Sequence, residues 1–360
     1  MSIKTSEWVS LGHPDKTADY ISSYILDRYI EKDPNVRYAL EIMIKDNNIF
    51  LGGEITSTEH YTDYDLSRFA KKALAEIGYT VKYHEKWGNH TIDPRNIKVT
   101  SVVSQQSPNI AQGVDNDGWG DQGIFFGYAE NDVDYMSGDY TIAKRLGQFL
   151  YQQAKEKGIG GLDIKTQVTC TDLLEKNVIE NVIVAIPILN DEEKSLVEKS
   201  VKQWLKDVMN EDYDELPYQL IINGTGEYKT HSSIGDCGIT GRKLVVDFYG
   251  SSSRIGGGSP WTKDPSKSDL ALNLYARKLA VEKMKEFENN EYVHHIEVEL
   301  ESCIGQPCKE ITYKIYGYNH LLETIYDYTN LTPSSVSKEL DLKKPIYTEL
   351  CRDGLFSKIS

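Results

Sequence analysis

The chain has 360 residues, of which 39% are hydrophobic and 10% aromatic, so it can build a packed core of two or three domains and is not a disordered chain. Its formal net charge of −15 argues against nucleic acid or an anionic membrane as a partner, and makes any local cluster of cations informative. No run approaches the ~18 apolar residues of a membrane span, and the N-terminus lacks the apolar stretch of a signal peptide.

The cysteines are odd in number and scattered along the chain, at positions 170, 237, 303, 308 and 351. None belongs to a CxxC pair, so a zinc site is not expected. Small core residues carrying reduced thiols in a cytoplasmic protein are the simplest interpretation.

In the first third of the chain, the spacing of apolar residues predicts a helix over 15–31 that Asp33-Pro34 ends. Apolar and polar residues then alternate over 36–45, which predicts a strand, and a turn at 46–48 leads into a hairpin partner at 49–51. A second amphipathic helix is predicted over 64–77, closed by Gly78.

Similar material recurs twice further along the chain. Helices are predicted over 140–157, 192–208 and 266–287, with helical segments from His320 and Pro333. Strands are predicted over 165–170, 178–189, 243–248, 295–301 and 311–316. Because the strands come in hairpins without a strict βαβ rhythm, the α+β class is favoured over a doubly wound sheet.

Three such blocks are visible, although no sequence repeat is clear enough to assert. The predicted boundaries fall near 105–117 and near 230. They give an N-terminal domain at 1–104, a central domain at 117–231, a C-terminal domain at 232–360 and a mobile loop at 105–117.

The first candidate site is Gly12-His13-Pro14-Asp15-Lys16, at the start of the first predicted helix. His13 and Lys16 would lie at a helix N-terminus, where free N–H groups and the dipole attract anions. Asp15 supplies a hard oxygen of the kind that Mg²⁺ prefers beside a phosphate. An ordinary capped helix start with solvated charges would explain the same residues.

The second candidate is the stretch 256–269, Gly-Gly-Gly-Ser-Pro-Trp-Thr-Lys-Asp-Pro-Ser-Lys-Ser-Asp. Three glycines let the backbone approach a ligand, Lys263 and Lys267 offer cations, and Asp269 offers a carboxylate for a metal. Ser266 is placed to cap the helix that follows. No Walker A loop occurs in the chain, and a flexible glycine loop is the alternative interpretation.

The third candidate is the stretch 235–243, Gly-Asp-Cys-Gly-Ile-Thr-Gly-Arg-Lys, a glycine-punctuated loop whose final cations suit a phosphate tail. A turn followed by two exposed cations would explain it as well. The stretch 118–123 matches GxGxxG by letter, but an apolar run typical of a strand follows it. A dinucleotide-binding turn is therefore rejected.

Smaller features have ordinary explanations when taken alone. Glu54 lies at the end of a hairpin strand, and Glu41 lies on the strand face opposite Tyr38 and Leu40, where a solvated face or a salt bridge would account for it. Three histidines, at 231, 294 and 295, have no ligand-like spacing and are interpreted as structural.

Taken together, these segments resemble the methionine adenosyltransferases, also called S-adenosylmethionine synthetases. The resemblance rests on an ordered set: GHPDK at 12–16, GGEIT at 52–56, QSPNIAQGV at 106–114, GDQGIFFGYA at 120–129, KTQVT at 165–169, GDCGITGRKLVVDFYG at 235–250, GGGSPWTKDPSKSD at 256–269 and LDLKKPIY at 340–347. It covers nearly the whole chain, and the order makes it specific.

The resemblance implies three interleaved α+β domains with pseudo-threefold symmetry, whose flat sheets pack at a subunit interface. It implies a homodimer or a dimer of dimers, with active sites between subunits. It also implies that ATP and L-methionine form S-adenosylmethionine, by sulfur attack on ribose C5′, after which bound tripolyphosphate is hydrolysed to phosphate and diphosphate.

Site residues follow by position from the same resemblance. The ATP ligands are His13, Asp163, Lys165, Glu227, Tyr228, Asp236, Arg242, Lys243, Ser259 and Lys263. Of these His13, Lys165 and Arg242 are catalytic, with Asp121 near the developing sulfonium. Methionine is held by Glu54, Gln106, Asp236 and Lys267. The metal ligands are Asp15 and Asp269 for Mg²⁺ and Glu41 for K⁺.

The chain departs from the usual family pattern at several positions. Glu227-Tyr228 stands where the family usually has Arg-Phe, Ser232-Ser233 where it has Gly-Gly, and Leu270 where it has Arg. The loop at 105–117, a lid over the substrates in the family, is several residues short. A different ATP-dependent enzyme, such as a kinase or triphosphatase, and a silent assembly subunit are the alternatives, but retention of Glu54 and Lys267 and of His13 argues against them.

Overall fold

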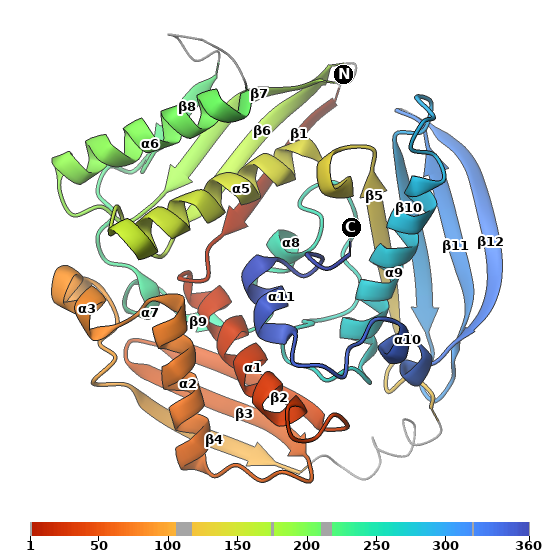
Figure 1. Cartoon of the computed structure of the whole chain (residues 1–360), viewed down its shortest axis with the longest axis horizontal. Coiled ribbons are helices and arrows are strands. Elements are labelled where there is room, and N and C mark those ends of the chain that lie inside the picture. Colours follow the sequence, from red (N-terminus) through yellow and green to blue (C-terminus); the bar gives the residue numbers. More distant parts are fainter. Residues whose placement is uncertain (1, 106–116, 174–175, 210–217, 319, 360) are drawn as a thin grey trace.

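The computed structural model describes residues 2–105, 117–173, 176–209, 218–318 and 320–359, whose strands form three four-stranded sheets (Figure 1). The first sheet has the order β4 (Lys98–Ser104), β3 (Asn48–Thr56), β2 (Arg37–Lys45) and β9 (Gly238–Ile239). The second has the order β1 (Ser2–Val9), β6 (Lys165–Leu173), β7 (Lys176–Ala185) and β8 (Gln219–Ile222). The third has the order β12 (Leu321–Leu331), β11 (Cys308–Tyr316), β10 (His295–Ser302) and β5 (Gly123–Glu130).

Helices connect and cover these sheets. They are α1 (Pro14–Ile30), α2 (Asp63–Ile77), α3 (Val81–Trp87), α5 (Gly138–Gln152), α6 (Asp191–Met209), α7 (Ser232–Gly235), α8 (Leu244–Asp247), α9 (Ser268–Lys285), α10 (Pro333–Glu339) and α11 (Tyr347–Asp353). Two 3₁₀ turns, Gly88–His90 and Val133–Tyr135, and a π turn, Gln153–Lys157, complete the helical segments. Within the described residues, no helix combines the length and the apolarity needed to span a bilayer.

Each sheet takes one strand from a distant part of the chain. β1 pairs antiparallel with β6, β5 pairs antiparallel with β10, and β9 pairs with β2 through Met43 and Ile239. The first block therefore lends a strand to the second, the second to the third and the third to the first. This cyclic exchange confirms the expected fold of interleaved α+β units, with the sheets arranged around α1 and α11 (Figure 1).

Helix α1 lies at the centre of the molecule, in contact with α2, α11, β2 and β9. All of its residues except Arg28 are buried, although many are polar. Such a helix has to pair its polar groups internally, because burying an unpaired polar or charged group is costly. These internal contacts fix the position of the first turn of α1, which contains part of the sequence motif at 12–16.

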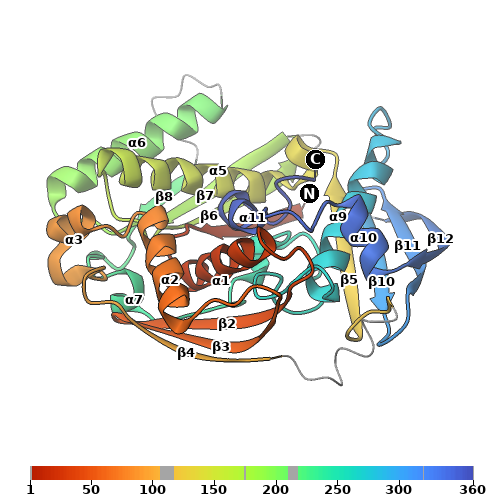
Figure 2. The ribbon, with the colours of Figure 1, turned by 60° about the horizontal axis from the view of Figure 1, so that its bottom comes forward.

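The alternation predicted for β2 is confirmed. Tyr38, Leu40, Ile42 and Ile44 are buried, while Met43 on the other face is exposed. Figure 2 shows α1 and α2 on one side of the sheet formed by β2, β3 and β4, with the opposite face open. That open face carries further exposed apolar side chains, Phe50 and Val102, and exposed apolar patches mark interaction sites.

Three predictions of local structure are wrong. The segment 244–247 is the short helix α8 and not part of a strand, because a short apolar run cannot by itself distinguish the two. The segment after His320 is the strand β12, whose eleven residues pair with β11 and are rich in the aromatic and β-branched types that favour strands. Ser266 does not cap α9; its hydroxyl and N–H both donate to Asp264, and Lys267 is the N-cap residue.

All five cysteines are free thiols, and those at positions 170, 308 and 351 are buried as predicted. Cys303 is exposed and Cys237 is half-buried, so these two are not core residues. The apolar run after Gly118-Trp119-Gly120 is the strand β5, which confirms that the GxGxxG match does not open a helix.

Candidate active site

The N-terminus of α1 presents His13 as its N-cap residue. His13 Nδ1 accepts a hydrogen bond from the backbone N–H of Asp15 at 3.1 Å, and Pro14 occupies the first turn. A Cβ on Gly12 would lie 2.2 Å from the carbonyl oxygen of Leu162, so only glycine permits this approach to the strand that leads into β6. The helix start is thereby fixed against the second sheet.

Burial lowers the pKa of His13 to about 2, and the nearby cations Lys243 and Lys165 act in the same direction. The imidazole is therefore neutral at physiological pH. Because Nδ1 accepts a hydrogen bond, the proton lies on Nε2. His13 can thus donate a hydrogen bond to an anionic ligand while carrying no charge of its own.

Asp15 joins α1 to the loop at 235–243. Its carboxylate is 1% exposed and accepts from the backbone N–H of Ile239 at 2.8 Å and from Lys243 Nζ at 2.6 Å. Arg242 Nε lies 3.6 Å from the same carboxylate, and a Cβ on Gly238 would lie 2.1 Å from the carbonyl oxygen of Pro14. Two motifs more than two hundred residues apart are therefore one structural unit.

Lys16 does not serve as an anion ligand, contrary to the sequence interpretation. Its ammonium group lies 2.6 Å from Asp247 and 3.1 Å from Asp19, and 4.3 Å above the ring of Trp261. Burial alone would lower the pKa of Lys16, but the carboxylate of Asp247 raises it above its ordinary value. The side chain is permanently charged and wholly used in holding α1 to α8.

Beside His13 lies a cleft of about 450 Å³, between the start of β6 and the segment 223–236. Predicted site residues that line it are His13, Asp163, Lys165, Glu227, Tyr228 and Asp236. Lys165 is the first residue of β6, and its side chain is exposed. An aromatic ring, an acidic group and a lysine thus surround one hollow.

Asp163 is the most deeply buried acidic group of the cleft, at 4% exposure. One carboxylate oxygen accepts from the N–H of Ser232 at 3.0 Å, and the other has no hydrogen-bond partner among the described residues. Burial raises the pKa of Asp163 to about 6. The unpartnered oxygen is therefore available to accept a hydrogen bond from a ligand in the cleft.

Tyr228 forms a wall of the cleft, and its hydroxyl donates to the carbonyl oxygen of Asp163 at 3.2 Å. The neighbouring Glu227 also lines the cleft but is largely in solvent, with 72% of its side chain exposed and Lys229 Nζ at 2.8 Å. Asp236 is exposed at the opposite wall. The aromatic ring is well placed for stacking, whereas Glu227 has a surface ion pair instead.

The loop at 256–269 lies along the edge of β2. The N–H of Leu40 donates to the carbonyl oxygen of Thr262 at 3.0 Å, and the N–H of Asp264 to that of Tyr38 at 3.1 Å. Lys263 is thereby opposite Ala39, which in turn is opposite Glu54 on β3. Glu54 and Lys263 therefore occupy one rung of the same sheet.

Within this loop, Asp269 accepts hydrogen bonds from Lys263 Nζ and, at 2.8 Å, from the N–H of Gly258. Lys267 is half-buried at the start of α9. Ser259 meets the other phosphate loop, because a Cβ on Gly241 (φ 73°) would lie 2.7 Å from its Cβ. The two glycine loops therefore adjoin each other.

Among the described residues, the other predicted site residues do not line this cleft: Asp15, Glu41, Glu54, Asp121, Arg242, Lys243, Ser259, Lys263, Lys267 and Asp269. Glu41 lies on the outer face of β2 and accepts from the hydroxyl of Thr240. Asp121 is exposed before β5, with its carboxylate on the N–H of Gln122 at 2.8 Å. Gln106 and most of the predicted loop at 105–117 lie outside the described residues.

Asp15 and Asp269 are separate carboxylates, each paired with a lysine. The described part of the chain contains no group of three or more His, Cys, Asp or Glu side chains arranged to hold a metal. Mg²⁺ is commonly held by one or two carboxylates together with substrate phosphates and water. The donors therefore fit Mg²⁺ as a bridge to a phosphate chain and do not form a preformed metal cage.

Sequence reasoning missed several residues that build the site. Asp247 anchors Lys16 and also accepts from the indole N–H of Trp261 at 2.8 Å; an acidic residue inside the apolar run 244–249 was the available signal. Tyr79 donates from its hydroxyl to the carbonyl oxygen of Gly12, and Thr240 donates to Glu41, contacts for which the sequence holds no signal.

A neutral histidine at a helix N-terminus and Lys165 line one cleft together with the first residues of the loop at 235–243, an arrangement typical of sites for phosphate-bearing ligands. Comparison with known families agrees. The S-adenosylmethionine synthetase N-terminal domain matches residues 1–108, the central domain residues 116–228 and the C-terminal domain residues 230–360.

A relative from Mycoplasmopsis synoviae, described as S-adenosylmethionine synthase, is 35% identical over 377 aligned positions, covering 98% of this chain and 92% of the relative. A solved structure, described as an unusual S-adenosylmethionine synthetase from Campylobacter jejuni, superposes with a TM-score of 0.84 at 29% identity, over 99% of this chain and 95% of the other. The chain belongs to the S-adenosylmethionine synthetase family. It is an adenosyltransferase that makes S-adenosylmethionine, in a family that uses ATP and methionine and is generally metal-dependent.

Proposed function

We propose that the chain joins ATP to L-methionine in one displacement and then hydrolyses the bound tripolyphosphate to diphosphate and phosphate. The observation that carries this proposal is a cleft lined by His13, Lys165 and Tyr228, with Arg242 and Lys243 close enough to His13 to act on its pKa. These groups suit a nucleotide with a long phosphate tail, since the aromatic ring offers stacking and the cations face the helix N-terminus.

In the displacement, a lone pair of the methionine sulfur forms the bond to ribose C5′. The C5′–O bond breaks, and its electron pair remains on the triphosphate as the sulfonium forms. The described lining of the cleft holds no serine or cysteine. None is needed, because the sulfur is itself the nucleophile and positioning contributes much of the rate.

The charge that moves onto the triphosphate is stabilised by fixed donors. We assign this role to Lys165, Arg242, Lys243 and Lys263, with His13 donating from Nε2 and Ser259 from the adjoining loop. Preorganised donors of this kind contribute strongly to catalysis, because they need no reorientation when charge develops. Asp163 accepts from the nucleoside, Tyr228 stacks on the adenine, and Glu227 and Asp236 border the nucleotide.

Methionine is assigned to Glu54, Gln106, Asp236 and Lys267, with Asp121 near the developing sulfonium. Asp15 and Asp269 would hold Mg²⁺, which supplies positive charge to the phosphate oxygens. Glu41 would hold K⁺ with the hydroxyl of Thr240 beside it. Each of these assignments follows the position of the residue in the family pattern.

We further propose a homodimer or a dimer of dimers in which the open faces of the sheets pack together. Met43, Phe50 and Val102 supply the exposed apolar surface, and Asp121 lies away from the cleft of its own chain. A site shared between subunits would bring such residues to the substrates. We place the enzyme in the cytoplasm, where its five free thiols would stay reduced.

The direct test incubates purified protein with ATP, L-methionine, Mg²⁺ and K⁺ and measures S-adenosylmethionine, phosphate and diphosphate. We expect equal amounts of the three products, loss of turnover in EDTA, and slower turnover when tetramethylammonium replaces K⁺. Phosphate release without S-adenosylmethionine would indicate a triphosphatase, and absence of all products would indicate a silent subunit. Full activity in EDTA would contradict the assignment of Asp15 and Asp269.

A further inference from the structure

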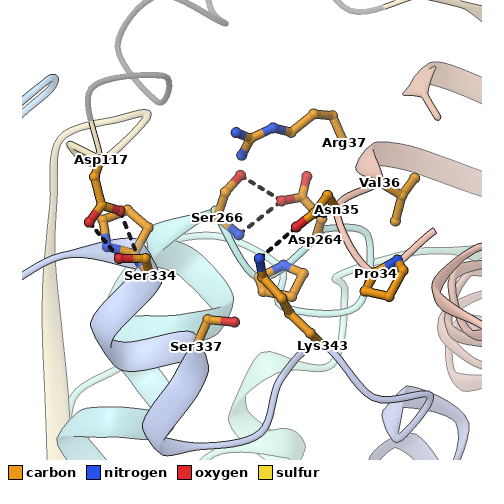
Figure 3. Close-up of a pocket in the computed structure, with 12 residues that line it drawn as sticks. Pro34, Asn35, Val36, Arg37, Asp117, Asp264, Ser266, Ser334, Ser337 and Lys343 are labelled. Carbon is orange, nitrogen blue, oxygen red and sulfur yellow. Dashed lines mark hydrogen bonds between the residues drawn. The ribbon is translucent and has the colours of Figure 1, made fainter. Parts of the chain in front are cut away.

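A second polar hollow, of about 110 Å³, lies apart from the candidate active site, and the two share no lining residue. It is formed where four distant segments meet: residues 34–37 before and within β2, Asp117, residues 264–266 of the glycine loop, and α10 with the turn that follows it (Figure 3). A volume of this size holds more than a single water molecule. It is therefore large enough for a small polyatomic ligand.

Arg37 contributes a guanidinium group that has no ion-pair partner among the residues that the structure describes. It lines the hollow, is half-buried, and donates no side-chain hydrogen bond among the described residues. Figure 3 shows it above Ser266, on the β2 side of the hollow. Guanidinium groups bind oxyanions through two parallel N–H donors, and an unpaired one in a hollow is a ready anion ligand.

Lys343 supplies a second cation on the opposite side. Its ammonium group donates to the side-chain oxygen of Asn35 at 2.6 Å, a neutral acceptor that fixes the group without cancelling its charge. Two ammonium protons remain for another acceptor. Arg37 and Lys343 thus present positive charge to one space from two separate segments.

Ser337 provides an independent sign of a missing ligand. It is 3% exposed and lines the hollow, yet its hydroxyl has no hydrogen-bond partner in the described ranges of the chain. Figure 3 shows this hydroxyl directed across the hollow towards Lys343. Buried hydroxyl groups are nearly always hydrogen-bonded, so this one indicates a ligand acceptor at that place.

Two carboxylates also border the hollow, but their oxygens are already engaged. Asp264 accepts from the N–H and hydroxyl of Ser266 and, at 2.8 Å, from the N–H of Tyr38. Asp117 accepts from the N–H of Ser334 at 3.0 Å and from its hydroxyl. Their charge is spread over five short donor contacts, and within the described part of the chain neither Arg37 nor Lys343 forms an ion pair, although Lys343 is near enough to help lower the pKa of Asp117.

We propose that this hollow is a second anion site, which takes a phosphate-sized oxyanion between Arg37, Lys343 and the hydroxyl of Ser337. The site does not depend on the assignment of the cleft at His13. It adjoins the loop that carries Lys267 and Asp269, since the N–H of Lys267 donates to the carbonyl oxygen of Asp264 at 3.0 Å. An anion bound here would therefore rest against the back of the second glycine loop.

The test measures inorganic phosphate binding by calorimetry in a Lys165→Ala background, which weakens the active-site cleft. Adding Arg37→Gln or Lys343→Gln should weaken phosphate binding at least about tenfold, the usual loss for one charged hydrogen bond. Adding Lys344→Gln is the matched control, because that lysine is exposed and paired with Asp341, and it should leave the Kd unchanged. A crystal soaked in selenate should show an anomalous peak within hydrogen-bond distance of Arg37 and Ser337.

Two outcomes would overturn the proposal. One is a phosphate Kd that Arg37→Gln and Lys343→Gln leave as it was, with selenate absent from the hollow. The other is a change of oligomeric state in Arg37→Gln, seen by light scattering, which would assign Arg37 to a subunit contact. Circular dichroism spectra like that of the unaltered protein would show that the variants are folded, so that a change in Kd or in oligomeric state can be attributed to the substituted side chain.

Discussion

Two lysine–aspartate clusters flank the first turn of α1 and have different tasks. On one side, Asp15 meets Lys243 and Arg242, and the side chain of Arg242 is 49% exposed. On the other side, Lys16 meets Asp19 and Asp247, all with side-chain exposures of 5% or less. We therefore expect these neighbouring residues of one motif to differ in role, Asp15 in the proposed ligand site and Lys16 as a structural anchor, according to how deeply their partners are buried.

The largest effect should follow from breaking the buried cluster. Lys16→Met leaves Asp19 and Asp247 without their counter-charge, and removing one partner of a buried ion pair typically costs about 3–5 kcal/mol. We expect that loss of unfolding free energy in urea titrations at pH 8. Lys344→Met, which breaks an exposed pair, is the control and should change it by less than about 0.5 kcal/mol. Equal losses of unfolding free energy in Lys16→Met and Lys344→Met would contradict the role of Lys16 as a structural anchor.

Arg242, the exposed member of the first cluster, should affect catalysis and leave the free energy of unfolding nearly unchanged. Arg242→Ala should slow S-adenosylmethionine formation and tripolyphosphate hydrolysis by ~10²–10³, the usual loss for one transition-state donor. Its unfolding free energy should stay within about 0.5 kcal/mol of the unaltered protein, since the side chain is half exposed. Unchanged rates of both partial reactions would remove Arg242 from the site.

His13 lies between the two clusters and links them to pH. Burial is the main cause that lowers the pKa of His13 to about 2 in the folded protein. The imidazole therefore stays unprotonated in the folded state at pH values below ~6.5, where the unfolded chain binds a proton. The contribution of neutral His13 to the free energy of unfolding should therefore be fully present above pH ~6.5 and decrease as the pH falls below that value. His13→Asn keeps a capping oxygen but cannot titrate. Between pH 7 and pH 5, the free energy of unfolding of this variant should therefore fall by less than that of the unaltered protein, the difference being up to ~2 kcal/mol. Identical losses in urea titrations would contradict the neutral assignment.

The smallest effect is expected at the mouth of the cleft. Glu227 and Lys229 form an ion pair that is mostly in solvent, and such pairs contribute ~0–1 kcal/mol. Glu227→Gln should leave the ATP KM within about fivefold, whereas Tyr228→Ala should raise it through loss of stacking. A large KM change for Glu227→Gln alone would show that this reversed charge contacts the nucleotide.

Local patterns in the sequence determined much of the secondary structure. The hairpin of β2 and β3 and the helices α2 and α6 follow from periodicity, because each buries one side with a fixed repeat. The apolar spacing also predicted α1 and α9, although these two helices are buried on nearly all sides. The ordered motifs also identified the family, and with it the chemistry. The strand β12 and the helix α8 were not predicted correctly, because short apolar or mixed runs show no period that distinguishes a helix from a strand.

What only the tertiary structure decided is which partner each charged group meets. The sequence contained Lys16 and Lys243 as equivalent cations, yet one lies under Trp261 with two carboxylates and the other reaches Asp15 beside the cleft. Local patterns gave no sign of the cyclic strand exchange, which only the family resemblance implied, because pairing between β1 and β6 or β5 and β10 depends on contacts more than 150 residues apart. Periodicity reports the burial of a segment, whereas partner choice is set by the folded arrangement of segments that are distant in the chain.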